Sequence, residues 1–310
     1  MKAPKQCIGE NLDAEGCRAV LKRHFSELEV AAVEVLNGGW DSRVFIVDGG
    51  YIFRFPRREY ALKQLRMEVG MLPELAPLLN LAIPRFEFIS PALAEHDADA
   101  PAFVGYPLIA GEFLTPGVFR ECVAGRPAEK HIAPQFGKFL TKLHAFPQAR
   151  AVELGVELAG RDSFPKYVEK LRKMVMPLLS PKAASRVERF GEESLKLWKE
   201  SSFEPVLAHN DLSAEHILFD RERGCISGVI DFGDMMIDDP AGDFVGFRYE
   251  YGEEFARRVL AHYERGLDEL AFSRMAMYRK LSPFHWVTYG LETGQPEFTQ
   301  RGVQMLEQEW

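Results

Sequence analysis

Short apolar runs separated by paired glycines dominate the first part of the chain. Three runs are rich in β-branched and aromatic residues: Val30 to Leu36, Arg43 to Val47 and Tyr51 to Phe55. They are separated by Asn37-Gly38-Gly39 and by Asp48-Gly49-Gly50. Because glycine adopts the positive φ angles of tight hairpins without strain, the pattern predicts a twisted antiparallel meander.

An amphipathic helix and two further strands are predicted after the meander. Apolar residues recur at helical spacing between 59 and 75, at Leu62, Leu65, Val69 and Leu72. Apolar runs at 82–90 and 101–112 then complete a five-stranded sheet with one helix. The first hundred residues are therefore interpreted mostly as strands.

From about Pro116 the pattern becomes helical. Between 131 and 146, apolar residues trace one buried helix face, at Ile132, Phe136, Phe139, Leu140 and Leu143. The stretches 163–179, 183–198 and 251–267 behave in the same way. A chain of 310 residues exceeds the usual span of one hydrophobic core. We therefore expect two lobes, residues 1–110 and residues 111–310.

Composition narrows the class of protein. Hydrophobic residues make up 46% and charged residues 27% of the chain, as in folded soluble proteins, and no run approaches the roughly 18 apolar residues of a membrane helix. The first residues lack the apolar core of a secretory signal, so we expect a cytoplasmic protein with reduced cysteines. A net charge of -8 argues against nucleic acid as the main partner. With no long exposed apolar stripe, a monomer is expected.

Two short apolar runs in the second half each end in acids. PVLAHND delivers Asp211, CISGVID delivers Asp231, and His216 lies between them in the sequence. If the two runs form strands that pair, both carboxylates face one cleft. Neighbouring carboxylates raise each other's pKa unless a cation neutralises them, so the arrangement indicates a shared proton or a metal. Mg²⁺ is favoured, because it typically binds one or two carboxylates together with substrate phosphates.

These motifs resemble those of a known family. His209-Asn210-Asp211 stands where protein kinases carry His-Arg-Asp, and Asp231-Phe232-Gly233 reproduces their D-F-G triplet. The kinase arginine and an A-P-E motif are missing, and the chain is instead similar to the kinase-like antibiotic phosphotransferases, most of all the aminoglycoside 2''-phosphotransferases. The resemblance implies an α+β, protein-kinase-like bilobal fold, with a five-stranded antiparallel sheet and a helix in the first lobe. The second lobe would be mainly helical with a short β catalytic segment.

The resemblance also implies roles for the polar residues. Asp211 would be the catalytic base, Asp231 would bind two Mg²⁺ ions, and His216 would bind one of them directly or through water. The alternative for His216 is a purely structural hydrogen bond in the loop. His209 and Asp243 would support the catalytic loop, and Asp234 is a candidate for a similar role.

In the first lobe, the resemblance implies a site for ATP or GTP. Arg54 would bind phosphates and pair with Glu68, with Lys63 as a competitor and a surface position for Arg54 as the alternative. Ser42, at the end of the turn Asn37 to Ser42, would contact a phosphate. Tyr106 to Ile109, including Leu108, would form the hinge that contacts the purine. The apolar walls would be Phe53 with Phe103 or Ile230.

An acidic stretch suggests the acceptor. From Asp231 to Glu254 there are eight acids and one base, Arg248. A polyamine sugar is multiply cationic, and a cleft lined by carboxylates would attract it, although a solvated helix face is the simpler alternative. The proposed lining consists of Asp211, Asp238, Glu250, Glu253, Glu254 and Trp286. Asp238 is equally a candidate for a structural role, and Trp286 for an ordinary core position.

The expected activity is phosphoryl transfer to an aminoglycoside hydroxyl, which confers antibiotic resistance. Three alternatives stay open: a macrolide phosphotransferase, a kinase of a small amino alcohol or sugar, and a nucleotide-binding regulator without transfer activity. The sequence does not decide between ATP and GTP.

Overall fold

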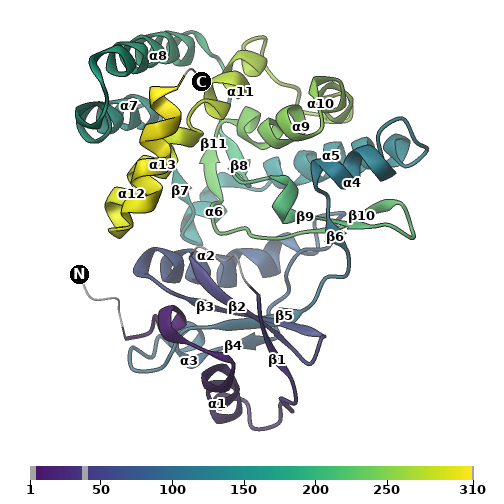
Figure 1. The fold of residues 1–310 in the computed structure, drawn as a ribbon. Coiled ribbons are helices and arrows are strands. Elements are labelled where there is room, and N and C mark those ends of the chain that lie inside the picture. Colours follow the sequence, from purple (N-terminus) through teal and green to yellow (C-terminus); the bar gives the residue numbers. More distant parts are fainter. Residues whose placement is uncertain (1–4, 37–40, 309–310) are drawn as a thin grey trace.

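The computed structural model describes residues 5–36 and 41–308, which form two lobes (Figure 1). The first lobe contains a five-stranded antiparallel sheet with strand order β1-β2-β3-β5-β4. Its strands are β1 (Val33–Leu36), β2 (Ser42–Val47), β3 (Tyr51–Pro56), β4 (Phe88–Ile89) and β5 (Val104–Pro107). The predicted five-stranded sheet is therefore confirmed.

Two helices cover opposite faces of this sheet. On one face, Leu62 and Leu65 of α2 (Glu59–Leu75) pack with Val104 of β5. On the other face lies α1 (Ala14–His24), which the sequence interpretation did not include. Its amino terminus is capped by Asp13, whose carboxylate accepts the Gly16 N–H at 2.7 Å.

The α1 face holds an aromatic cluster that includes Phe53, Phe55 and Phe103. All three side chains are buried, and the Phe55 and Phe103 rings stack at 4.9 Å. Successive residues of a strand point to opposite faces, so Arg54, between two members of this cluster, points to the α2 side. Phe53 and Phe103 therefore lie away from the Arg54 side of the sheet, and the prediction that they form a wall of the nucleotide site is wrong. On β3, the neighbour that shares the Arg54 face is Ile52, which is paired with Tyr106.

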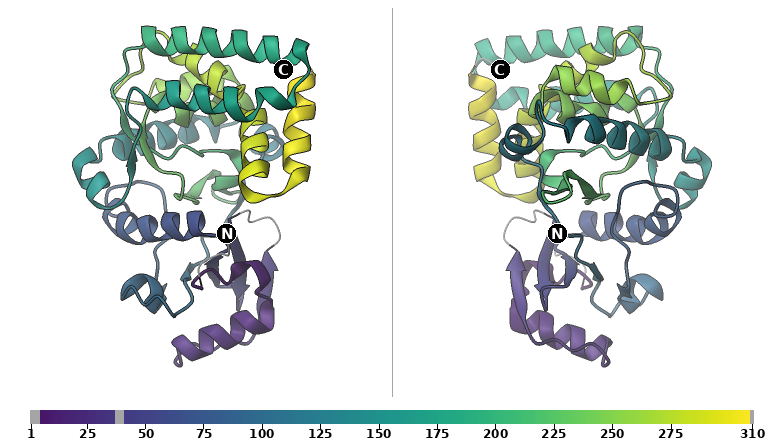
Figure 2. Two further views of the ribbon diagram at one scale, coloured as in Figure 1. Left: turned by 90° about the vertical axis from the view of Figure 1, so that its left-hand side faces the viewer. Right: turned by 90° about the vertical axis from the view of Figure 1, so that its right-hand side faces the viewer.

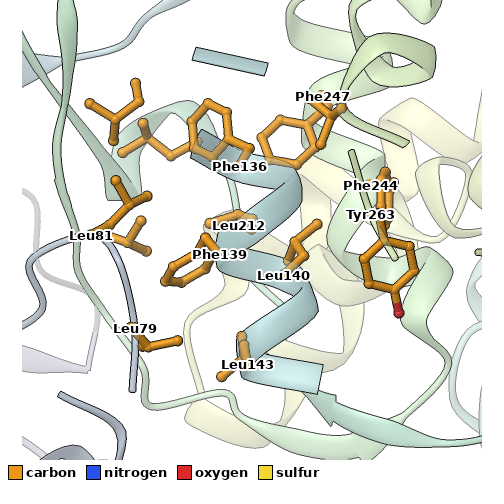
Figure 3. Packing of buried hydrophobic residues seen from close by; sticks show 14 of the residues in the cluster. Leu79, Leu81, Phe136, Phe139, Leu140, Leu143, Leu212, Phe244, Phe247 and Tyr263 are labelled. Carbon is orange, nitrogen blue, oxygen red and sulfur yellow. The ribbon is translucent and has the colours of Figure 1, made fainter. Parts of the chain in front are cut away.

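Helix α2 belongs to both lobes. Its later apolar residues, Met67, Met71, Leu72 and Leu75, join the main core of the second lobe. That core surrounds α5 (Glu129–His144), the helix seen with its packed side chains in Figure 3. The predicted buried face of α5 is confirmed, because its five apolar residues have no exposed surface. α2 is thus held against the sheet at one end and against the second lobe at the other.

The second lobe is mainly helical. Two of its helices, α7 (Ser163–Met174) and α8 (Pro181–Glu200), share a separate core with α12 (Ser282–Thr293) and α13 (Pro296–Glu307), and the four lie together in Figure 2. The remaining α-helices are α3 (Pro91–Ala94), which belongs to the first lobe, and α4 (Pro116–Cys122), α6 (Gln148–Glu153), α9 (Val245–Glu250), α10 (Glu253–Leu260) and α11 (Ala271–Arg279). None of the helices within the described ranges has an apolar stretch long enough to cross a membrane.

Two small three-stranded sheets form the β segment of the second lobe. One has the order β10-β9-β6 and consists of β6 (Glu112–Phe113), β9 (Ile217–Asp220) and β10 (Cys225–Val229). The other has the order β7-β11-β8 and consists of β7 (Glu157–Leu158), β8 (Val206–Ala208) and β11 (Met236–Asp238). The α+β bilobal fold is confirmed.

One predicted pairing is wrong. The strands that precede Asp211 and Asp231 are β8 and β10, and they belong to different sheets. β10 pairs with β9, its immediate neighbour in the chain, through a short turn, whereas β8 pairs antiparallel with β11. The two aspartates are therefore brought together by the loops after these strands and not by direct strand pairing.

Candidate active site

The loop that carries Asp211 is anchored by a buried acid. The Asp243 carboxylate accepts the backbone N–H groups of His209 at 2.8 Å and of Asn210 at 2.7 Å. It also contacts the Nε2 atom of His144, on α5, at 3.0 Å. Burial alone would raise the pKa of Asp243, but the hydrogen bond with His144 lowers it below its usual range. Asp243 therefore stays ionised and makes contacts that suit the structural role expected for it.

His209 supports the same loop from inside. Its side chain is buried, with Nδ1 accepting the Asp211 N–H at 3.3 Å and Nε2 lying 3.2 Å from the Ile230 carbonyl oxygen. This set of contacts needs a neutral imidazole with its proton on Nε2. Burial lowers the pKa of His209 to about 4, which keeps the ring neutral near pH 7.

The buried His209 predicts acid sensitivity. Its pKa is lower in the folded state than the ordinary 6.5, so the unfolded chain binds the proton more tightly. Above about pH 6.5 His209 is neutral in both states and costs no stability. As the pH falls from about 6.5 toward about 4, the free energy of unfolding decreases by roughly 3 kcal/mol. Urea titrations at pH 7 and 4.5 should therefore show a smaller loss of stability in His209→Gln than in the wild type. An equal loss in both proteins would contradict a buried neutral imidazole.

Asp211 and Asp231 approach one imidazole from two sides. The Nδ1 atom of His216 lies 3.4 Å from an Asp211 carboxylate oxygen, and Nε2 lies 3.4 Å from an Asp231 carboxylate oxygen. His216 Nδ1 is also 2.7 Å from the Asp211 carbonyl oxygen, which needs a proton on Nδ1. Burial lowers the pKa of His216, but Asp211 and Asp231 outweigh burial and raise it, so a cation bound between Nε2 and Asp231 would compete with a proton on Nε2.

The two acids differ electrostatically. Burial raises the pKa of Asp211 to about 6, against the opposing effect of His216. For Asp231, burial is outweighed by Arg54 and His216, and the pKa is lowered. A carboxylate with a pKa near neutrality suits proton transfer, whereas one that stays ionised suits metal binding.

Asp231 and His216 would supply only part of the ligands that a Mg²⁺ ion needs. Within the described part of the chain, no group of three His, Cys, Asp or Glu side chains is arranged to hold a metal ion. Mg²⁺ usually completes its shell with water and substrate phosphates, so one carboxylate with one further side chain is a sufficient protein contribution.

Arg54 connects Asp231 to α2. Its guanidinium donates to Glu68 at 2.8 Å and lies 3.4 Å from Asp231. Glu68 is fully buried, and this raises its pKa to about 7 although Arg54 acts in the opposite direction. The competing candidate, Lys63, is exposed and pairs with Glu157 of β7. Arg54 is therefore the cation placed beside Asp231.

The candidate hinge, Tyr106 to Ile109, begins in the last two residues of β5 and continues beyond it. Tyr106 is buried, and burial raises its pKa although Arg54 acts in the opposite direction. The Leu108 N–H donates to the Gly50 carbonyl oxygen at 2.8 Å, while its side chain is exposed. Ile109 and Ile230 are half-buried. Purine contacts through these residues remain a prediction, and the Leu108 amide already has a partner.

Ser42 lies at the start of β2, buried and opposite Pro56. Residues 37–40 of the predicted turn lie outside the described residues, and phosphate binding by Ser42 stays a prediction.

The acidic stretch is distributed over several environments. Glu250 is half-buried and accepts the Ala214 N–H of the catalytic loop at 2.6 Å. Glu253 instead pairs with Arg248 at 2.9 Å and with Arg257 at 2.6 Å, and Glu254 pairs with Arg258 at 2.5 Å. Their charges are thus matched by guanidinium groups, which weakens them as attractors of a cationic acceptor.

The other two acceptor candidates also have local partners. Asp238, in β11, accepts the Asp239 N–H at 2.8 Å. Trp286, in α12, is half-buried; its ring stacks on Phe298 at 5.5 Å and lies under the Arg301 guanidinium at 4.1 Å. Contacts of either residue with an acceptor remain predictions.

The fold and this site define the class of protein. Two lobes joined by a shared helix, with an Arg-Glu pair in one lobe and two aspartates in the other, form the architecture of a kinase-like phosphotransferase. The profile of the Phosphotransferase enzyme family matches residues 32–278, and the chain belongs to that family.

Individual relatives agree with this assignment. The chain is 30% identical to viomycin phosphotransferase of Streptomyces vinaceus over 132 residues, which cover 42% of this chain and 45% of that protein. The solved GDP and kanamycin complex of the aminoglycoside phosphotransferase APH(2")-IIIa superposes with a TM-score of 0.83 at 25% identity, covering 94% of this chain and 97% of that one. The solved macrolide 2'-phosphotransferase type I has the same fold, with a TM-score of 0.73 at 23% identity over 96% and 99% of the two chains. The resemblance to the aminoglycoside 2''-phosphotransferases is confirmed.

Proposed function

We propose that this protein transfers the γ-phosphoryl group of ATP or GTP to a hydroxyl group of an aminoglycoside, and so confers resistance to it. The observation that carries the proposal is the approach of Asp211 and Asp231 to His216, each within 3.4 Å of one ring nitrogen. A single imidazole therefore lies between the carboxylate that we propose as proton acceptor and the carboxylate that we propose as metal ligand.

In this proposal each group has one task. Asp211 accepts or orients the proton of the attacking hydroxyl group. Asp231 and His216 would hold Mg²⁺, with Asp231 shared between two ions, and bound Mg²⁺ would neutralise charge on the β- and γ-phosphates. Arg54, fixed by Glu68, binds phosphate oxygens. Residues 1–110 would supply nucleotide binding, and 111–310 catalysis and acceptor binding.

The charge around Asp211 supports a cationic acceptor. Asp234 and Glu215 both act on Asp211 electrostatically and raise its pKa, and Glu250 is bound to the same loop. A multiply charged amino sugar would be attracted by this group of carboxylates. The names of two relatives indicate antibiotic acceptors, since one is a viomycin phosphotransferase and the other was solved with kanamycin. Such an enzyme is expected to act as a cytoplasmic monomer.

An acceptor panel tests the proposal. Purified protein with Mg²⁺ and either ATP or GTP is incubated with kanamycin-type aminoglycosides, viomycin, a macrolide and small amino alcohols. We expect release of the nucleoside diphosphate with aminoglycosides, and phosphorus NMR of the product locates the modified hydroxyl group. In Asp211→Asn the release should be slower by about 10²- to 10⁴-fold. Phosphorylation of the macrolide or an amino alcohol alone would contradict the aminoglycoside proposal. Nucleotide binding without turnover on any acceptor would favour a regulator.

A further inference from the structure

One face of α2 runs along the segment that carries Asp231. Tyr60, Gln64 and Glu68 are spaced four residues apart, so their side chains lie on one side of the helix. Glu68 reaches Asp231 through Arg54. Gln64 Nε2 and the Tyr60 hydroxyl group donate to the same carboxylate oxygen of Asp234, at 2.6 Å and 3.1 Å. The segment 231–234 is therefore attached to α2 at both ends.

The segment between these attachments is tightly placed. Asp231 has a φ of 63°, a left-handed conformation that few residues other than glycine adopt. A side-chain carbon at Gly233 would lie 3.3 Å from both Gln64 and Glu68, so the backbone there packs directly against α2. An unusual backbone conformation persists only where its surroundings hold it, and here α2 is the surrounding element.

α2 itself is a fixed support. Its apolar residues pack into the first lobe through Leu62 and Leu65 and into the core of the second lobe through Met67 and Met71. A contact between α2 and the segment 231–234 thus ties Asp231 to both lobes. Asp234 is exposed, so its side chain is not needed to fill a core.

We propose that Asp234 is a positioning residue: as the acceptor of the Gln64 and Tyr60 hydrogen bonds, it holds the metal-binding Asp231 in register with Arg54. This inference rests on the proposed function, in which Asp231 binds Mg²⁺ and Arg54 binds phosphate. The competing role for Asp234 is a direct ion pair with an ammonium group of the acceptor. The two roles differ in chemistry, because the first needs a hydrogen-bond acceptor and the second needs a negative charge.

Amide and alanine substitutions separate these roles. Asp234→Asn keeps an oxygen that accepts both hydrogen bonds, whereas Asp234→Ala removes it, and a Tyr60→Phe, Gln64→Ala double variant removes the donors. Each protein is titrated with a non-hydrolysable nucleoside triphosphate with and without Mg²⁺, by calorimetry. Transfer kinetics then give kcat and the KM of the acceptor. Glu74→Gln is the matched control, because it weakens another contact of α2 with the second lobe, the ion pair with Arg150.

If Asp234 is a positioning residue, the Mg²⁺-dependent gain in nucleotide affinity is about 10-fold smaller in Asp234→Ala and in the double variant than in the wild type, and kcat falls with it. A loss of this size is typical when a group that supports a metal ligand is removed. The KM of the acceptor, the thermal unfolding midpoint and the Glu74→Gln values stay near the wild type. Asp234→Asn restores most of the gain. Combining Asp234→Ala with the double variant adds no further loss, because both variants break the same two hydrogen bonds.

The opposite pattern overturns the inference. If Asp234→Asn raises the acceptor KM as much as Asp234→Ala and leaves Mg²⁺-nucleotide binding unchanged, Asp234 is an acceptor-binding charge. A double variant with wild-type Mg²⁺-nucleotide binding would also refute it. The titration needs no acceptor, so a wild-type protein that binds Mg²⁺-nucleotide but phosphorylates nothing refutes the proposed function alone. A wild type without any Mg²⁺-dependent gain refutes both.

Discussion

Asp211→Asn is expected to lower kcat by about 10²- to 10⁴-fold, the range that a positioned base contributes. The amide keeps the size of the side chain but cannot accept the proton of the hydroxyl group. Nucleotide affinity should stay near the wild type, because Arg54 and Asp231, which are proposed to act at the phosphates, have no hydrogen bond with Asp211 within the described residues. Steady-state transfer kinetics and calorimetric titration with Mg²⁺-nucleotide measure the two quantities separately.

The control for this change is Glu222→Gln, which removes one negative charge from the exposed turn between β9 and β10. It should leave both kcat and nucleotide affinity unchanged. If Asp211→Asn retained more than about a tenth of the wild-type kcat, Asp211 would not be the base. A parallel loss of nucleotide affinity would instead show that the substitution disturbs the loop held by Asp243.

The features that the sequence predicts well are those in which neighbours in the chain are also neighbours in space. The hairpins of the first sheet follow from glycine turns, and the buried face of α5 follows from apolar residues at helical spacing. The placement of Asp211, His216 and Asp231 follows from motifs within about twenty residues of one another. The pairing of Arg54 with Glu68 needed only the family pattern of a strand residue and a helix acid.

Features that depend on distant contacts were missed. Nothing near Val206–Ala208 indicates that its strand partner is Met236–Asp238, since the hairpin of β9 and β10 lies between them in the chain. The role of His144 depends on α5 passing beside Asp243, 99 residues further along. The stretch from Asp231 to Glu254 contains many more acids than bases, but Arg257 and Arg258 lie just beyond it in the chain and form ion pairs with Glu253 and Glu254.

For two features, the face on which Phe53 lies and the polar face of α2, the sequence contains a local signal. The two-residue alternation of a strand places Phe53 on the face opposite to Arg54, and it places Ile52 on the same face as Arg54. The four-residue spacing of Tyr60, Gln64 and Glu68 marks a polar face on a helix whose other residues are largely apolar. A polar face that includes a fully buried glutamate is a sign of a functional contact.

In Asp231→Asn, the Mg²⁺-dependent gain in nucleotide affinity is expected to be smaller than in the wild type by at least about 10- to 100-fold. Even groups that only support metal ligands have effects of this size. The Asp231 carboxylate lies 3.4 Å from Arg54 on one side and 3.4 Å from His216 on the other. Replacing it by an amide removes the charge that attracts the cation. Calorimetric titration with and without Mg²⁺ measures the gain directly.

The affinity for nucleotide without Mg²⁺ should not fall in Asp231→Asn, since the change removes a negative charge from beside the triphosphate. Only the difference between the two titrations should shrink, with Glu222→Gln again as the control for charge. This outcome contrasts with Asp234→Asn, three residues away, which keeps its hydrogen bonds to α2 and should keep the gain. The same Asp→Asn change is therefore expected to remove the Mg²⁺-dependent gain at position 231 and to keep it at position 234. Asp231 needs its negative charge, whereas Asp234 needs only an oxygen that accepts hydrogen bonds. An undiminished gain in Asp231→Asn would exclude Asp231 as the metal ligand.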